Sequence, residues 1–187
     1  MKYIYLFVLL VLGAPFLSAT TNQEVMQEAK GAIQKMGKAL KSNMKKNMKA
    51  GGPLQAAKFC SQEASNIEKK INASYKDGVS VKRISLKYRN PNNKPSADEL
   101  KVLQSIENDI AVHKKVPKMI VKKIAPNHYK VYKPMFIQKA VCLTCHGDAK
   151  TRSIEAYTLI KEKYPHDLAV NYKEGDFRGA MVAEIVK

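Results

Sequence analysis

The feature that most constrains this 187-residue chain is the run KAVCLTCHGDAK, residues 139–150, in which Cys142, Cys145 and His146 stand close together. Two thiols separated by two residues suit three chemistries: a redox dithiol, half of a zinc site, or the covalent attachment of a haem. Each of these needs a different structure around the cysteines. The remainder of the chain therefore has to decide between them.

The opening segment MKYIYLFVLLVLGAPFLSAT predicts a secretory signal peptide. Lys2 supplies the positive charge, a long apolar run follows, and Ser18-Ala19 provides small residues at its end for cleavage. We expect residues 1–19 to be a signal peptide and residues 20–187 to form a single periplasmic domain. An uncleaved membrane anchor is the alternative, because the apolar run approaches the length of a spanning helix.

The number of cysteines and the expected export together narrow the choice among the three chemistries. The chain has only three cysteines. A zinc site would need two further ligands, and the histidines elsewhere show no ligand spacing. A thioredoxin-type dithiol belongs to a βαβ unit, whereas the residues from His146 onward predict a loop. Cys-x-x-Cys-His in an exported protein is typical of c-type haem, whose vinyl groups take up two thiols while the adjacent histidine binds iron. We therefore expect one covalent haem c on Cys142 and Cys145, with His146 as the proximal iron ligand.

The third cysteine lies in the stretch PLQAAKFCSQEASNIEKKI. Small and apolar residues recur there every three or four positions, which predicts a helix whose core-facing side includes Cys60. Cys60 is then either a buried thiol packed as a small hydrophobe or a thiolate that binds the iron opposite His146. Methionines compete for that second role, and the candidates are Met36, Met44, Met119 and Met135.

Periodicity predicts an α+β domain with a pair of helices at its N-terminal end. The first helix covers residues 22–49 and ends at Gly51-Gly52-Pro53, after which the helix bearing Cys60 begins. A third helix starts at the capping box Ser96–Glu99, and a short fourth one follows the Cys-x-x-Cys-His motif. Alternating apolar residues predict one or two strands over 79–86, a hairpin over 116–138 that turns at Pro126-Asn127, and a final strand over 181–185.

Four separated stretches make the chain resemble a known family, the exported c-type haem domains with a PAS-like fold. These stretches are FCSQEA around Cys60, RISLKYRNPNNKP from Arg83, CLTCHGD from Cys142 and YPHDLAVNYKEGDFRGA from Tyr164. Members of the family occur alone and as input modules of bacterial membrane receptors and kinases. The resemblance implies a twisted antiparallel sheet flanked by helices. It also implies that Cys60 lies where the family can supply a thiolate ligand opposite the histidine.

Three arginines are further candidates for the site. We expect Arg83, Arg89 and Arg178 to contact the haem propionates, because a guanidinium group binds a carboxylate in bidentate fashion. The alternative for each is an exposed side chain without a ligand. We expect Asp176, which lies between two glycines, to be a turn residue that accepts backbone hydrogen bonds rather than a catalytic acid. Tyrosines are candidates to line the haem or to be half-buried sheet residues, namely Tyr129, Tyr132 and Tyr164.

The charge balance bears on partners, because 33 Lys and Arg face 16 Asp and Glu and give a formal net charge of +17. A nucleic-acid partner is not expected for an exported chain without a reader motif. The excess of positive charge keeps the surface solvated. It also favours binding to an acidic redox or signalling protein, or to an anionic membrane surface.

Two functions remain open at this stage. In the first, the protein is a haem sensor in which reduction or a diatomic gas displaces one iron ligand; the family resemblance favours this role. In the second, it is a simple periplasmic electron carrier with His/Met or bis-His ligation, which the chain's end at residue 187 without an output module favours. An enzyme is not expected, because the sequence displays no polar set beside an open iron position.

Overall fold

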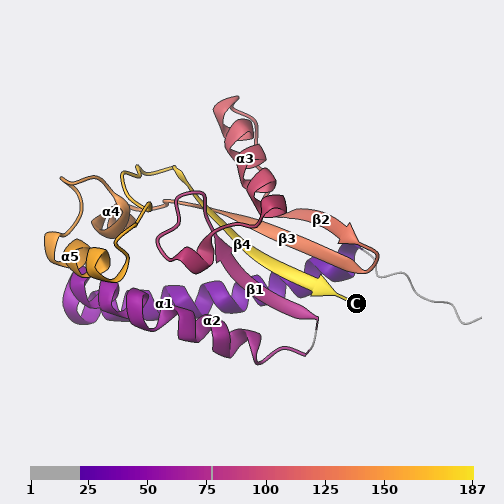
Figure 1. Ribbon diagram of the computed structural model, residues 1–187, viewed down its shortest axis with the longest axis horizontal. Helices are drawn as coiled ribbons and strands as arrows, with labels where there is room; N and C mark the ends of the chain where they lie inside the picture. Colours follow the sequence, from indigo (N-terminus) through magenta and orange to yellow (C-terminus); the bar gives the residue numbers. More distant parts are fainter. Residues whose placement is uncertain (1–21, 77) are drawn as a thin grey trace, which may run out of the picture.

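A four-stranded antiparallel sheet forms the centre of the described part of the chain, residues 22–76 and 78–187 of a computed structural model (Figure 1). Its strand order is β1-β4-β3-β2, so the C-terminal strand lies between β1 and β3. The predicted signal peptide, residues 1–19, lies outside the described residues. The strands are β1 (Val79–Ile84), β2 (Ile120–Ala125), β3 (His128–Phe136) and β4 (Phe177–Val186).

The predicted pair of N-terminal helices is present, and glycine explains the break between them. Helix α1 (Asn22–Gln62) contains non-helical backbone at Gly51-Gly52, where Gly52 has φ of 64° and ψ of −157°, a conformation open mainly to glycine. The chain folds back there, and Gln55 Nε2 donates a hydrogen bond of 3.2 Å to Asn47 Oδ1 across the bend. Helix α2 (Ala64–Asn72) then runs toward β1 (Figure 1).

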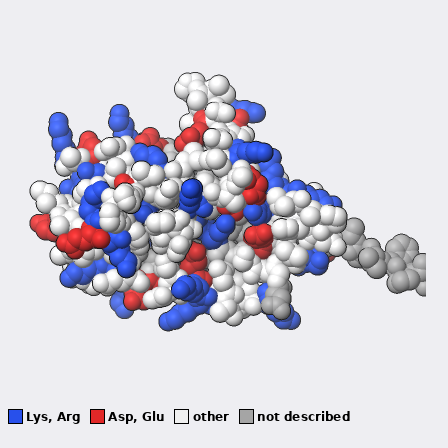
Figure 2. Space-filling model, viewed as in Figure 1, with Lys and Arg blue, Asp and Glu red and all other residues white. Residues whose placement is uncertain are grey.

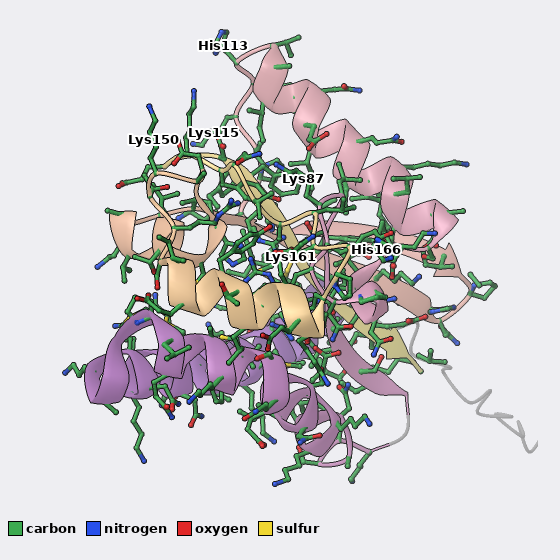
Figure 3. The ribbon with its side chains drawn as sticks, turned by 60° about the vertical axis from the view of Figure 1, so that its left-hand side comes forward. Lys87, His113, Lys115, Lys150, Lys161 and His166 are labelled. Atoms are coloured by element: carbon green, nitrogen blue, oxygen red, sulfur yellow. The ribbon has the colours of Figure 1, made fainter. Side chains whose placement is uncertain are left out.

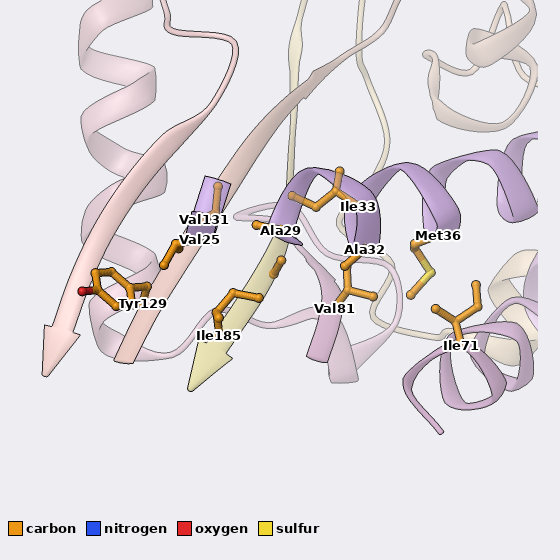
Figure 4. Close-up of a cluster of buried hydrophobic side chains, with 11 residues drawn as sticks. Val25, Ala29, Ala32, Ile33, Met36, Ile71, Val81, Tyr129, Val131 and Ile185 are labelled. Carbon is orange, nitrogen blue, oxygen red and sulfur yellow. The ribbon is translucent and has the colours of Figure 1, made fainter. Parts of the chain in front are cut away.

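The first half of α1 covers one face of the sheet. Val25, Ala29 and Met36 recur at helical spacing and are fully buried against side chains from the strands (Figure 4). This apolar cluster fixes α1 on the sheet. It comprises Val25, Ala29, Ala32, Ile33, Met36, Ile71, Val81, Tyr129, Val131, Ala183 and Ile185.

Helix α3 (Ala97–Ala111) packs on the opposite face of the sheet. It begins at the predicted capping box, where the backbone N–H of Ser96 donates to Glu99 Oε2 at 3.0 Å. Its buried residues Leu103 and Ile106 belong to a second cluster, with Ile84, Tyr132, Ala180 and Val182. Successive strand residues point to opposite faces, so one sheet can serve both clusters.

The Cys-x-x-Cys-His motif lies on the short helix α4 (Ala140–His146), which follows β3. Helix α5 (Ile154–Lys163) comes next and packs on the second half of α1 through Ala57, Ala156 and Ile160. A 3₁₀ helix (Pro91–Asn93) occupies the connection after β1. This arrangement of a sheet flanked by helices confirms the predicted α+β, PAS-like fold class. None of the helices in residues 22–76 and 78–187 is both long and apolar enough to cross a membrane.

Candidate functional site

The predicted thioether, iron-ligand and propionate residues, apart from some of the competing methionines, line one cavity of about 320 Å³. The cavity lies where the second half of α1, the connection after β1, helix α4 and the start of β4 meet. Segments far apart in the sequence are therefore brought together here. The predicted residues that line it are Cys60, Arg83, Arg89, Cys142, Cys145, His146 and Arg178.

The two cysteines of the motif are free thiols one helical turn apart on α4. Residues three positions apart lie on the same face of a helix, so Cys142 and Cys145 both line the cavity. Burial raises the pKa of Cys145, although the nearby Arg89 opposes that shift. The pair therefore presents two neighbouring thiols to one space.

His146 is held in one orientation by a hydrogen bond of 2.9 Å between its Nδ1 and the carbonyl oxygen of Ala169. Because a carbonyl only accepts, we assign the proton to Nδ1, which leaves the lone pair of Nε2 free for a metal. Burial lowers the pKa of His146 well below its usual value, and the charges of Arg178 and Arg89 lower it further. The ring is therefore a neutral imidazole suited to metal binding.

Cys60 corrects one prediction. The helical pattern placed its side chain in the packed core, but Cys60 is exposed while Ala57 and Ala64, one turn to either side, are buried. The side of the helix that carries the small and apolar residues does face inward. At Cys60, however, that side borders the cavity rather than packed side chains. Surrounding protein atoms desolvate the thiol and raise its pKa to about 11, with a contribution from Cys145.

The cavity also separates the candidate methionines. Met44 and Met135 line it, whereas Met36 is buried in the core and Met119 packs against that core. Met48 lines the cavity as well, although the sequence analysis did not single it out. Its position one helical turn after Met44 was the signal that could have found it.

The tyrosines divide in the same way. Tyr164 lines the cavity, and its hydroxyl donates to the carbonyl oxygen of Ser61 at 3.5 Å. Tyr129 and Tyr132 are buried sheet residues, one in each apolar cluster. Asp176 is the predicted turn residue, since its carboxylate accepts from the backbone N–H of Lys173 at 2.7 Å.

The three arginines differ in their partners. Arg83 pairs weakly with Glu68, with 3.5 Å between Nε and Oε2, and Arg89 pairs with Asp167 at 3.1 Å. Arg178 is held by neutral groups: it donates to Ser85 Oγ at 2.7 Å and to the carbonyl oxygen of Lys87 at 3.1 Å. Burial lowers the pKa of Arg178. A partly buried cation with neutral partners is a favourable place for an incoming carboxylate.

A second cavity, of about 340 Å³, lies between the first half of α1 and the β2–β3 hairpin and has no cysteine or histidine in its lining. Its lining includes the candidate Met119 but no thiol or imidazole that could pair with that thioether as a haem site. Within residues 22–76 and 78–187, no three His, Cys, Asp or Glu side chains gather as a metal-ion cluster.

Comparisons with known proteins agree with this fold. A family model described as Tll0287-like matches residues 18–185. Among solved structures, the crystal structure of the cyanobacterial heme-protein Tll0287 is similar over 90% of this chain and 98% of its own, with a TM-score of 0.66 and 24% sequence identity. No curated protein matches the chain. At this identity the structural similarity establishes the shared fold.

Proposed function

The chain belongs to the Tll0287-like family, and from that premise we propose that it is a monohaem c-type protein. Cys142 and Cys145 would bind the haem through thioethers, and His146 would be the proximal iron ligand. The observation that carries the proposal is the shared cavity of two free thiols and a neutral imidazole whose Nε2 is free. That the structurally similar Tll0287 is described as a heme-protein supports the same assignment.

The rest of the cavity fits the two parts of a haem. Apolar side chains suit the porphyrin plane, and they include Phe136, Ile137 and Val141. The propionates need cations, and Arg178 is a partly buried guanidinium group whose described partners are neutral. Arg83, whose contact with Glu68 is long, is the second candidate. Arg89 is occupied by protein groups, which makes a propionate contact from it less favourable than the other two.

We assign the second iron ligand to Cys60. Its thiol is exposed to the cavity that His146 lines, and a thiolate there would lower the reduction potential. The methionines in the lining favour the alternative, since Met44, Met48 and Met135 each offer a thioether that would raise the potential. The protein would thus control the haem by providing the second iron ligand and by releasing it.

For the physiological role we propose a periplasmic haem sensor that responds to redox state or to a diatomic gas. Breaking the bond between Cys60 and the iron would free the helix that carries Cys60. The helix would then have two states, held by the iron and released from it. A periplasmic electron carrier is the second candidate, favoured by the thioethers in the lining. We propose no enzymatic activity.

The surface suits an acidic redox or signalling partner, or an anionic membrane surface. Lysines and arginines are scattered over the face shown in Figure 2, with acidic residues between them. Figure 3 shows Lys115 and Lys150 projecting away from the body of the molecule. Such a surface would attract an acidic partner through the summed electrostatic field of many charges rather than through one contact.

The decisive test is expression with a c-type haem maturation system, followed by denaturing electrophoresis with haem detection. We expect haem to stay bound to the denatured wild-type chain and to be lost from Cys142→Ser/Cys145→Ser. The matched control is Cys60→Ser, which should keep the covalent haem. A wild-type chain that carries no covalent haem would overturn the proposal.

Carbon monoxide then separates the two roles. If the reduced protein binds the gas readily, one iron ligand exchanges and the sensor is supported. If the reduced iron refuses the gas, both ligands are held firmly and the electron carrier is supported.

A further inference from the structure

Arg89 ties three segments together beside the proposed iron ligand. Its Nε donates to Asp167 Oδ2 at 3.1 Å, and its Nη2 donates to the carbonyl oxygens of Cys145 at 2.7 Å and Ala169 at 3.3 Å. The same Nη2 lies 3.5 Å from His146 Nδ1. One guanidinium group thus contacts the motif helix and the loop before β4.

Asp167 completes this arrangement at the backbone N–H of the same residue, Ala169. Its side chain is fully buried, and that of Arg89 is only 13% exposed. Oδ1 of Asp167 accepts from the backbone N–H of Ala169 at 2.8 Å. Arg89 and Asp167 therefore hold the Ala169 backbone by its carbonyl and its N–H together.

The Ala169 carbonyl is the group that orients His146. It accepts from Nδ1 of His146 at 2.9 Å and from Arg89 at 3.3 Å, so two donors share one oxygen. A partner on the second nitrogen of a metal-binding histidine sets the ring orientation and its basicity. The guanidinium draws electron density from that oxygen and adds a positive charge, whereas Asp167 adds a negative one.

We infer that Arg89 and Asp167 are a positioning pair, which orients His146 through the Ala169 carbonyl and sets the reduction potential of the bound haem by two opposed charges. The inference rests on the proposed function, because it concerns the same histidine. It differs from a propionate contact for Arg89, since the guanidinium acts here through a backbone carbonyl of the protein.

The test compares Arg89→Gln with Asp167→Asn in the haem-loaded protein by spectroelectrochemical titration. Loss of the cation favours the ferric state, so Arg89→Gln should lower the potential. Loss of the buried anion should raise it in Asp167→Asn. We expect each charge to change the reduction equilibrium about tenfold, which is 59 mV for a one-electron couple. Shifts of opposite sign are the signature, because a purely structural defect would move both variants the same way.

Two further variants separate charge from geometry. Arg89→Lys keeps the positive charge but loses the fork that reaches Asp167 and two carbonyls at once, so its potential should stay nearer the wild type than that of Arg89→Gln. Arg152→Gln is the matched control, since Arg152 donates to the carbonyl of Gly147 at 3.3 Å and lies over the Tyr157 ring rather than at Ala169. It should shift the potential less than Arg89→Gln does.

The haem-free protein gives an independent measurement. Nitrogen-15 NMR of the imidazole should show His146 as the Nδ1–H tautomer in the wild type and a mixture of tautomers in Asp167→Ala. Equal tautomer populations in both, or potential shifts of the same sign in Arg89→Gln and Asp167→Asn, would overturn the inference. A wild-type chain that shows the Nδ1–H tautomer but takes up no covalent haem would instead overturn the proposed function and leave the tautomer control standing.

Discussion

His146 and Cys60 illustrate how single side chains are adapted to the cavity in opposite ways. Burial and two arginines keep the imidazole neutral, so it is ready to bind a metal through Nε2. Cys60 is exposed to the cavity, but the protein atoms around its thiol desolvate it and keep it protonated, with its pKa raised to about 11. A thiol must lose its proton to become a ligand, so iron binding at Cys60 would be coupled to proton release.

Replacing Cys60 by alanine tests this ligand directly. We expect the absorption spectrum of the oxidised haem protein to change and its reduction potential to rise, because an electron-donating thiolate is removed. The measurement is a redox titration followed by absorbance. Met48→Ala is the matched control from the same cavity and should leave both unchanged. The opposite result, with Met48→Ala altering the spectrum and Cys60→Ala silent, would move the assignment to the thioether.

Gly179 makes a second prediction at the residue scale. Its φ of 135° is disfavoured for other residues, and an added Cβ would collide with the carbonyl oxygen of Ile84. We expect Gly179→Ala to lower the free energy of unfolding by about 2–4 kcal/mol, measured by urea denaturation.

Gly31 provides the control for that substitution. It lies inside α1, and an added Cβ would meet nothing within 4 Å. Gly31→Ala should therefore stabilise the protein by about 0.5–1 kcal/mol through helix propensity. Equal effects of the two substitutions would contradict this account of Gly179.

At the scale of elements, charge pairs attach α3 to the sheet. Glu99 is fully buried beside Lys82, at 2.9 Å, and Lys130, at 3.3 Å. Lys130 also donates to Asp98 Oδ2 at 2.8 Å. The first turn of α3 is thus joined to β1 and β3 by ion pairs, while Leu103 and Ile106 supply its apolar contact. A buried carboxylate needs such partners to remain charged.

Acid should loosen this attachment through Asp98. Hydrogen bonds from Lys130 and then Ser96 lower the pKa of Asp98 from 3.8 to about 2. A lowered pKa means that the stabilisation is complete above pH 3.8 and is lost as the pH falls toward 2. Asp98→Asn should therefore show a smaller loss of stability than the wild type across this window, measured by urea unfolding at each pH. Solvent exposure keeps the effect modest, and parallel curves for the two proteins would contradict it.

At the scale of the whole molecule, the excess of positive charge should act on encounter rates. If the field steers an acidic partner, electron exchange should be fast at low salt and slow down as ionic strength rises. The measurement is stopped-flow electron transfer between the haem-loaded protein and an acidic redox protein. A neutral small-molecule reductant is the control and should show no such dependence. A rate that is the same at low and high salt would rule out steering.

Local elements of the fold followed well from the sequence. The break at Gly51-Gly52, the capping box at Ser96 and the hairpin turn at Pro126-Asn127 all lie where expected. Strand ends were less accurate, since β1 stops at Ile84 and β4 begins as early as Phe177. Strand ends depend on pairing partners, and the strands that pair with β1 and β4 are distant from them in sequence.

The sequence by itself determined the grouping of Cys142, Cys145 and His146, because they are neighbours in the chain and their spacing is a local property. Helix periods and turns are local in the same sense. Only the tertiary structure decided that Cys60 faces a cavity rather than the core, and that Arg89 meets Asp167 across 78 positions of sequence. Such contacts depend on where the chain reverses and on the order of the strands. No pattern within a single helix or strand carries that information, because it arises only when separate elements pack together.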